Sequence, residues 1–208
     1  MFSKHRIEAL SDAVIAIAMT LLVIEIKAPP ADVPGGLAYA LLHDRHEWIS
    51  FAVSFTLASI FWSIQHRVFD EMEEMDTVSL VLTFAFLGFV TVLPFSTAVW
   101  GRHINDPIAH TVYFCNQFLI ASLLLLKLER ARIKGHLRSG IESDSLRLRL
   151  LFMCLLMGSA AIATRLVRID HVWWFLFPLA LIARYMRHLQ KKKATALAAA
   201  AVPTIREG

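Results

Sequence analysis

One ionisable residue near the start of the chain is a candidate for chemistry. Asp12 follows Ser11 and stands directly before the apolar segment 13–24. A carboxylate there can cap a helix, because the first helical turn has free N–H donors and a positive dipole end. It can also bind a cation or a proton in a membrane protein. Position alone favours capping, and Arg6, six residues away, lies on a different helical face.

A stripe of apolar residues follows Asp12 at helical spacing. Ile17, Thr20, Leu21 and Ile24 recur at i, i+3, i+4 and i+7 and therefore share one face of a helix. Packing inside a bundle is the commoner reason for such a stripe. The other is a pore wall, where aliphatic rings form a water-excluding constriction and a threonine supplies oxygens to a partly dehydrated cation. Spacing alone leaves both interpretations open.

The apolar segments contain no pattern typical of an enzyme. We find no nucleophile–base pair, acidic pair or zinc motif in them, so we predict no catalytic residue, no bound metal and no cofactor. Cys115 and Cys154 lack C-x-x-C spacing, which argues against a disulfide framework. An enzyme is therefore the least favoured class of function.

The composition is that of a membrane protein. Hydrophobic residues make up 57% of the 208 residues and charged residues 18%, against roughly 45–50% and 25% in soluble domains. Six apolar segments are long enough to cross, or nearly cross, a hydrocarbon core of about 30 Å. We predict an all-α membrane protein with transmembrane helices at approximately residues 10–26, 48–68, 78–100, 108–126, 148–167 and 172–189.

Proline and glycine mark the expected limits of these helices. The Pro- and Gly-rich segment 29–36 ends the first helix and opens a loop, and Pro94 predicts a kink in the third. We assign residues 1–193 to one transmembrane domain. Residues 194–208 form an Ala-rich tail, either disordered or an extension of the sixth helix. Because no internal repeat is visible, any symmetry must come from several copies of the chain.

Basic residues divide unequally between the two predicted sides of the membrane. Sixteen of the 21 lysines and arginines fall on the side of both termini and of the loops after the second and fourth helices. Cytoplasmic loops carry such an excess, so both termini are predicted to be cytoplasmic, in a multi-pass protein of the cell membrane. This topology accounts for the net charge of +4 without a nucleic-acid partner. The five residues on the other side are Lys27, Arg45, Arg102, Arg165 and Arg168.

The start of the first helix resembles a known family. Arg6, Leu10, Ser11 and Asp12 form an Arg-x-x-x-Leu-Ser-Asp motif. It resembles the Arg-x-x-x-Phe-Ser-Asp motif of the transmembrane protein 175 family, which are potassium channels of lysosomes and bacteria. Leu10 departs from the family's phenylalanine, so the way in which the first helix is anchored can differ here.

Two later segments extend the resemblance over at least the first hundred residues. Trp62, Gln65 and His66 belong to a Trp-x-x-Gln-His-Arg-x-Phe segment, similar to the family's Trp-x-x-His-His-Arg-x-Phe. Residues 93–97, Leu-Pro-Phe-x-Thr, match a further motif of the family. Gln65 stands where the family has a histidine, which puts in doubt any role that needs two imidazoles.

The resemblance implies a potassium-selective channel, a homotetramer in the lipid bilayer whose pore is lined by the first helix of each subunit. Such a pore differs from the fold with a Thr-Val-Gly-Tyr-Gly carbonyl filter, a sequence that this chain lacks. By position, the hydrophobic constriction that acts as gate falls on Ile17, Leu21 and Ile24, and a selectivity hydroxyl on Thr20. Arg6, Leu10, Ser11 and Asp12 are expected to anchor the helix, with support from Trp62 and His66.

Two other classes of function remain open from the residues alone. A proton- or cation-coupled secondary transporter would use Asp12 as its ion site, although an inverted repeat and charges near mid-membrane are missing from the sequence. An inert membrane scaffold is the other. Coupling of flux to a proton gradient separates the transporter from the channel, and a silent bilayer recording indicates the scaffold.

Overall fold

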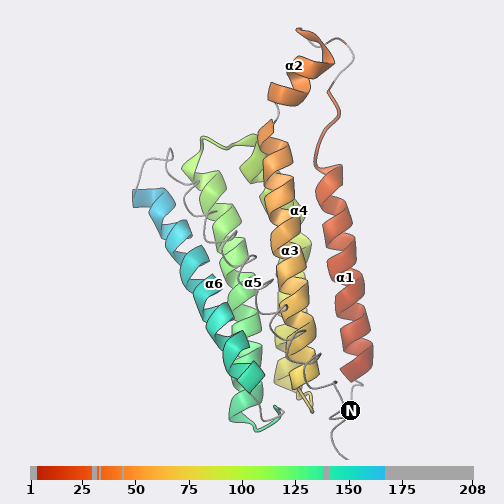
Figure 1. Cartoon of the computed structure of the whole chain (residues 1–208), viewed down its shortest axis with the longest axis vertical. Coiled ribbons are helices and arrows are strands. Elements are labelled where there is room, and N and C mark those ends of the chain that lie inside the picture. The colour runs from red at the N-terminus through yellow and green to blue at the C-terminus, as the bar shows by residue number, and fades with distance from the viewer. Residues whose placement is uncertain (1–3, 30–31, 33, 44, 138–140, 167–208) are drawn as a thin grey trace, which may run out of the picture. The chain divides into compact units, whose positions relative to one another are not determined.

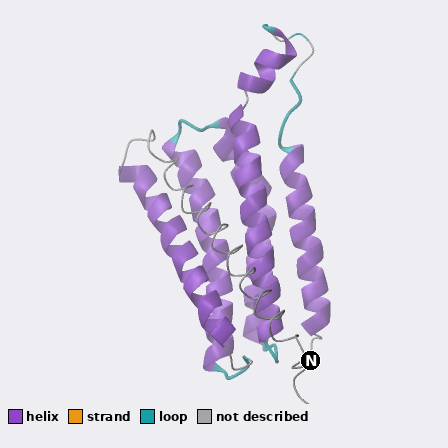
Figure 2. Ribbon diagram, viewed as in Figure 1, coloured by secondary structure: helices purple, strands orange, loops and turns teal. Residues whose placement is uncertain are grey.

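The computed structural model describes residues 4–29, 32, 34–43, 45–137 and 141–166, and these ranges contain α-helices and no strand (Figures 1 and 2). Five of the described helices are long and apolar enough to cross a membrane, namely α1 and α3 to α6. The helices are α1 (Lys4–Ile24), α2 (Gly36–His43), α3 (Arg45–Glu71), α4 (Thr77–Arg102), α5 (Pro107–Ile133) and α6 (Ile141–Leu166).

Each of the first five predicted spans corresponds to one of these long helices. The sixth predicted span, 172–189, and the tail, 194–208, lie outside the described residues. The helices extend past the apolar segments, since α1 already includes Lys4 and α5 continues to Ile133. Backbone hydrogen bonds also form in the polar end turns of a helix, and lysine and arginine reach water from these turns. Hydropathy therefore marks the apolar middle of each helix and misses its polar ends.

One local expectation differs from the structure, and a second is not tested by it. The segment that follows α1, which we expected to be a loop, contains the short helix α2. The third predicted span, α4, continues as helix on both sides of Pro94, and the kink expected there stays a prediction. The proline ring removes one N–H donor, and the buried position of Pro94 inside the helix shows that the surrounding packing tolerates that loss.

The helix α4 holds the described bundle together. It packs against α1, α3 and α5, and α5 in turn packs against α6. Side chains of three helices meet where Leu22, Ala58 and Leu93 form a buried apolar cluster. Removing such side chains from water stabilises the contact by about 25 cal/mol per Å² in aqueous reference systems, and close packing takes over that role in lipid.

Polar side chains also join the helices. The hydroxyl of Tyr113 on α5 lies 3.0 Å from the hydroxyl of Ser54 on α3. The Ser54 hydroxyl also accepts a 2.8 Å hydrogen bond from Thr97 of α4. Asn116 donates to Ser96 at 3.2 Å, so it links α5 to α4. All of these side chains are buried. Hydrogen bonds of this kind between membrane helices contribute about 1 kcal/mol each.

The turn between α3 and α4 is fixed to the far end of α5. Asp76 caps α4 by accepting a 2.8 Å hydrogen bond from the Ser79 backbone N–H, and it accepts two more from Arg130, at 2.9 Å from Nε and 2.6 Å from Nη2. The Arg130 guanidinium, followed by the Ser79 bonds, holds the pKa of the Asp76 carboxyl well below its usual range. This carboxyl therefore stays ionised at a pH low enough to protonate an ordinary aspartate, and its charged contact with Arg130 persists there.

Candidate functional site on the first helix

The helix α1 has a packed face and an exposed face. It lies against α3 and α4. On the packed face Ile15 is only 1% exposed. On the opposite face Ile17 is 58% exposed and Ile24 is 70% exposed. The buried positions of α1 are Ile7, Ser11, Ile15, Ala18 and Leu22.

The exposed face contains the stripe predicted from spacing. Ile17, Thr20, Leu21 and Ile24 are all exposed, and Leu10 continues the same face towards the N-terminal end. These side chains therefore do not pack in the core of their own subunit. They are available to lipid, to a pore or to a neighbouring subunit.

Thr20 supplies the one hydroxyl of this stripe. Its Oγ1 donates a 2.8 Å hydrogen bond to the backbone carbonyl of Ile17, one turn earlier in α1. The hydroxyl proton is thereby directed at the helix backbone. The lone pairs of the oxygen remain available on the exposed side, where they can accept a hydrogen bond from water or contact a cation.

Asp12 does not cap α1, which corrects the interpretation that position alone favoured. The helix already includes Lys4, so Asp12 lies in its third turn, where the backbone N–H groups are bonded within the helix. Its Oδ1 instead accepts a 2.8 Å hydrogen bond from the indole Nε1 of Trp62 on α3. The neighbouring Ser11 is buried and donates to its own backbone, to the carbonyl of Ile7 at 2.9 Å.

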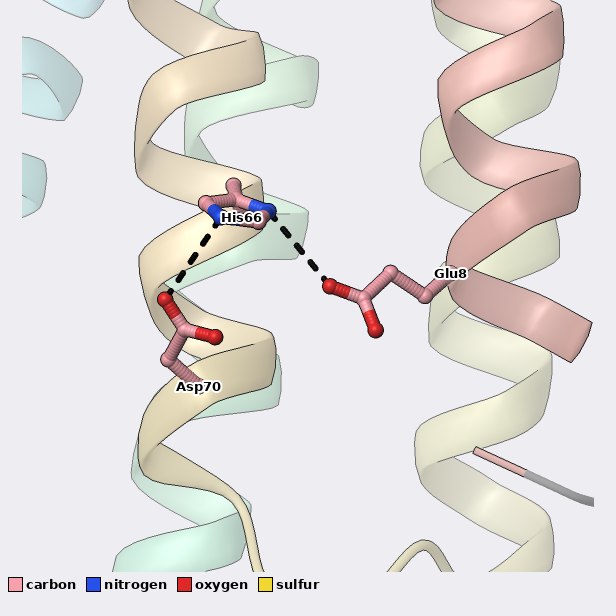
Figure 3. Close-up of side chains that lie close together, drawn as sticks. All are labelled: Glu8, His66 and Asp70. Carbon is pink, nitrogen blue, oxygen red and sulfur yellow. Dashed lines mark ion pairs between the residues drawn. The ribbon is translucent and has the colours of Figure 1, made fainter. Parts of the chain in front are cut away.

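A second contact lies one turn closer to the N-terminus. Nδ1 of His66 is 3.4 Å from Oε1 of Glu8, and Nε2 of the same ring is 3.7 Å from Oδ2 of Asp70 (Figure 3). Trp62 stacks on His66 with the ring centroids 5.9 Å apart. Glu8 and Asp12 are four residues apart on α1, and their partners His66 and Trp62 are four residues apart on α3 in the reverse order. The two antiparallel helices therefore form a ladder of polar contacts.

Sequence reasoning found one half of this ladder. Trp62 and His66 were expected to support α1, and the structure brings both against it. Glu8 and Asp70 were not predicted as site residues. The signal that identifies them is the i, i+4 spacing of Glu8 with Asp12 and of His66 with Asp70. Arg6 is exposed and forms no ion pair within the described part of the chain.

The other end of α1 is tied by charges that sequence reasoning did not assign to the site. Arg102, at the end of α4, donates to the backbone carbonyl of Glu25 at 2.8 Å and lies 3.4 Å from its carboxylate. The same guanidinium is 3.7 Å from Glu47 in the first turn of α3. Both ends of α1 are therefore held to the bundle by polar contacts, while its middle presents the apolar stripe.

We expect the hydrogen bond between Asp12 and Trp62 to anchor α1. A double-mutant cycle of Asp12→Ala and Trp62→Phe should give a coupling free energy of about 1 kcal/mol, because phenylalanine keeps the ring and removes only the N–H donor. Thermal unfolding of the purified protein in detergent measures it. Additive single-variant effects would show that the contact does not hold the helix. Asp106→Ala, which removes a helix cap at the start of α5, is the matched control and should be additive with Trp62→Phe.

Exposure does not by itself separate a pore wall from a lipid contact. Leu148, Leu155 and Ile162 on α6 are also 63–71% exposed, as expected for side chains that face lipid. The α6 face also carries an exposed hydroxyl, Ser159, which donates to the Leu156 carbonyl at 3.0 Å. What distinguishes the exposed face of α1 is its position between two polar anchors, the Trp62 contact and the Arg102 contact. We call this set, Ile17, Thr20, Leu21 and Ile24, the α1 stripe.

Comparison with known proteins bears on the segment that contains this stripe. A family profile described as endosomal/lysosomal potassium channel TMEM175 matches residues 6–94. The chain is 37% identical over 106 residues to a potassium channel of Streptomyces collinus, a match that covers 51% of this chain and 52% of the relative. It is 30% identical over 135 residues to the human endosomal/lysosomal proton channel TMEM175, covering 60% of this chain and 27% of that protein.

The similarity in three dimensions is more extensive. A crystal structure of a lysosomal potassium-selective channel TMEM175 homologue from Chamaesiphon minutus superposes with a TM-score of 0.75 at 28% identity. That comparison covers 88% of this chain and 95% of the other. The sequence matches, in contrast, span about half the length of the Streptomyces relative and about a quarter of the human one.

Proposed function

Because the chain belongs to the TMEM175 family, we propose that it forms a potassium-selective channel in the cell membrane. The α1 helices of four identical subunits line the pore. The observation that carries this proposal is the α1 stripe, which is exposed in the single subunit and lies inside the segment that matches the family. A helix with an exposed apolar face between two polar anchors suits the wall of a pore shared by several copies.

The gate follows from the chemistry of the stripe. Four copies of Ile17, Leu21 or Ile24 form aliphatic rings, and a narrow aliphatic ring expels water from the pore. An ion then loses its hydration without receiving other ligands, so the closed ring is a barrier. Widening the rings readmits water and opens the channel.

Selectivity follows from the same rings together with Thr20. Potassium gives up its water more readily than sodium, so a tight aliphatic passage favours potassium. Four Thr20 oxygens, with their protons donated to the helix backbone, offer partial replacement of the lost water ligands. Discrimination of this kind is weaker than that of a filter built from carbonyl oxygens.

The residues of the Arg-x-x-x-Leu-Ser-Asp motif are proposed to anchor the helix rather than to contact ions. The Asp12 contact with Trp62 supports this role, as does the burial of Ser11 against the bundle. Arg6 and Leu10, both exposed in the single chain, are proposed to reach the neighbouring subunit.

A second candidate is proton movement through the same pathway. It is favoured by the human relative, which is named a proton channel. A proton-coupled transporter with Asp12 as its ion site is the other form of this alternative. Asp12 already accepts a hydrogen bond from Trp62, however, and it lies off the α1 stripe.

Flux into liposomes tests the proposal directly. Liposomes that contain the purified protein and are loaded with potassium should release their potassium faster than matched liposomes loaded with sodium release their sodium. We expect this release without any imposed proton gradient. Potassium release that requires a proton gradient would support the transporter, and proton flux without potassium flux would support the proton channel. Absence of all three fluxes from a folded oligomer would contradict a channel and favour a scaffold.

A further inference from the structure

The contact between α1 and α3 contains a group of side chains that the proposed pore does not use. Glu8, His66 and Asp70 each offer one ligand atom, and the three atoms all lie within 4.8 Å of one another (Figure 3). We propose that these residues form a binding site for a divalent transition-metal ion of the zinc class, which crosslinks α1 to α3.

The donor set fits such an ion. One imidazole and two carboxylates combine a nitrogen ligand with oxygen ligands, a mixture that suits zinc and its neighbours better than magnesium or calcium, which prefer oxygen alone. The two carboxylates also supply two negative charges to balance a divalent cation. His66 and Asp70 are one helical turn apart on α3, a spacing at which two side chains can hold the same ion.

Binding of a single ion requires one carboxylate side chain to rearrange. Donor atoms that share a zinc ion lie roughly 3 to 3.6 Å apart, because each bond is about 2.0–2.2 Å long. In the structure, the His66 ring approaches Glu8 to 3.4 Å and Asp70 to 3.7 Å through its two different nitrogens. Because these two nitrogens point away from each other, a single ion binds only one of them, and the carboxylate beside the other nitrogen must change its rotamer to reach the ion.

The surroundings orient the ligands and leave room for water. Trp62 stacks on the His66 ring and is itself held by Asp12, so the imidazole is supported by an outer layer of contacts. The side chains of His66 and Asp70 are 48% and 62% exposed. Water can therefore complete a coordination shell that has three protein ligands.

The site was missed from the sequence because its ligands come from two helices. No single segment contains a metal motif, and the i, i+4 pair on α3 is by itself common on solvated helices. Only the register between α1 and α3 adds Glu8. A metal ion there restrains the end of the helix that bears the α1 stripe, but binding itself does not depend on the channel proposal.

Calorimetric titration of the purified, detergent-solubilised full chain with Zn²⁺ tests the site, using an affinity tag that contains no histidine. We expect one Zn²⁺ per chain and no comparable heat with Mg²⁺. Glu8→Gln and His66→Gln should each weaken Zn²⁺ binding at least about tenfold. The matched control is His103→Gln, which changes an exposed histidine at the C-terminal end of α4 and should leave the affinity unchanged.

A second control concerns His5, which lies 4.0 Å from Glu8 on the same helix. His5→Gln should leave binding intact, whereas a loss with His5→Gln but not with His66→Gln would overturn the assigned ligand set. If Mg²⁺ and Zn²⁺ bind with equal affinity, and His66→Gln does not weaken either, the group is a general acidic surface and the proposed transition-metal site is wrong. If one variant fails to fold, the remaining ligand variant and the two histidine controls still decide the question.

Discussion

Replacing Ile17 by asparagine should raise potassium flux through the reconstituted protein about tenfold. Ile17 is the first aliphatic residue of the α1 stripe after the polar anchor, and it is 58% exposed. In the proposed tetramer, four asparagine amides would replace a water-excluding ring with hydrogen-bonding groups. A barrier lowered by about 1.4 kcal/mol corresponds to a tenfold rate. Tracer potassium uptake into liposomes, normalised to reconstituted protein, measures the change.

The chain offers a closely matched control for this experiment. Ile162 on α6 is 63% exposed, so Ile162→Asn makes the same chemical change at similar exposure outside the proposed pore. That variant should leave flux near the wild-type level. If the two variants behave alike while both remain folded and oligomeric, the rise has no connection with the α1 stripe, and α1 is not the pore wall.

The sequence predicts the membrane helices well because their signal is local. A run of apolar residues needs no information about its neighbours, and the first five predicted spans correspond to α1 and α3 to α6. The ends were less accurate, since α1 begins six residues before Leu10. Ile7 is buried against the bundle, so packing stabilises these polar turns as helix where hydropathy predicts none.

Short helices and buried aromatic residues are harder to predict. The helix α2 has only eight residues, which is too short for a clear period next to the prolines and glycines before it. Trp100, at the end of α4, has the position of an interface anchor in the sequence. In the structure it is buried and stacks on Tyr113 of α5, with the ring centroids 4.5 Å apart.

The contact between Asp12 and Trp62 shows which part of the site the sequence predicts and which part it does not. Asp12 and Trp62 can each be singled out from motifs, but their contact depends on how far α1 is shifted along α3. That shift is set by buried side chains such as Ile15 and Ala18, whose packing a single sequence does not specify. The same register brings Glu8 to His66, which is why that group was found only in the structure.

Thr20→Val should lower the preference for potassium over sodium about fivefold while preserving potassium flux. Valine has nearly the shape of threonine, so the change removes the hydroxyl oxygen and leaves the width of the stripe unchanged. A hydrogen-bonding oxygen contributes about 1 kcal/mol, which corresponds to roughly this factor. The bi-ionic reversal potential in planar bilayers, or the ratio of potassium to sodium flux in liposomes, measures the preference.

Two further variants separate a role of the oxygen in the pore from a local effect on the helix. Thr91 on α4 is exposed and donates to the Gly88 carbonyl at 2.7 Å, as Thr20 donates to Ile17 at 2.8 Å. Thr91→Val therefore removes the same intrahelical bond outside the α1 stripe, and it should leave selectivity unchanged. Thr20→Ser retains the hydroxyl and should keep most of the preference. If Thr20→Val discriminates as well as the wild type, selectivity arises from the aliphatic rings alone, since dehydration then remains the only step that separates the two ions.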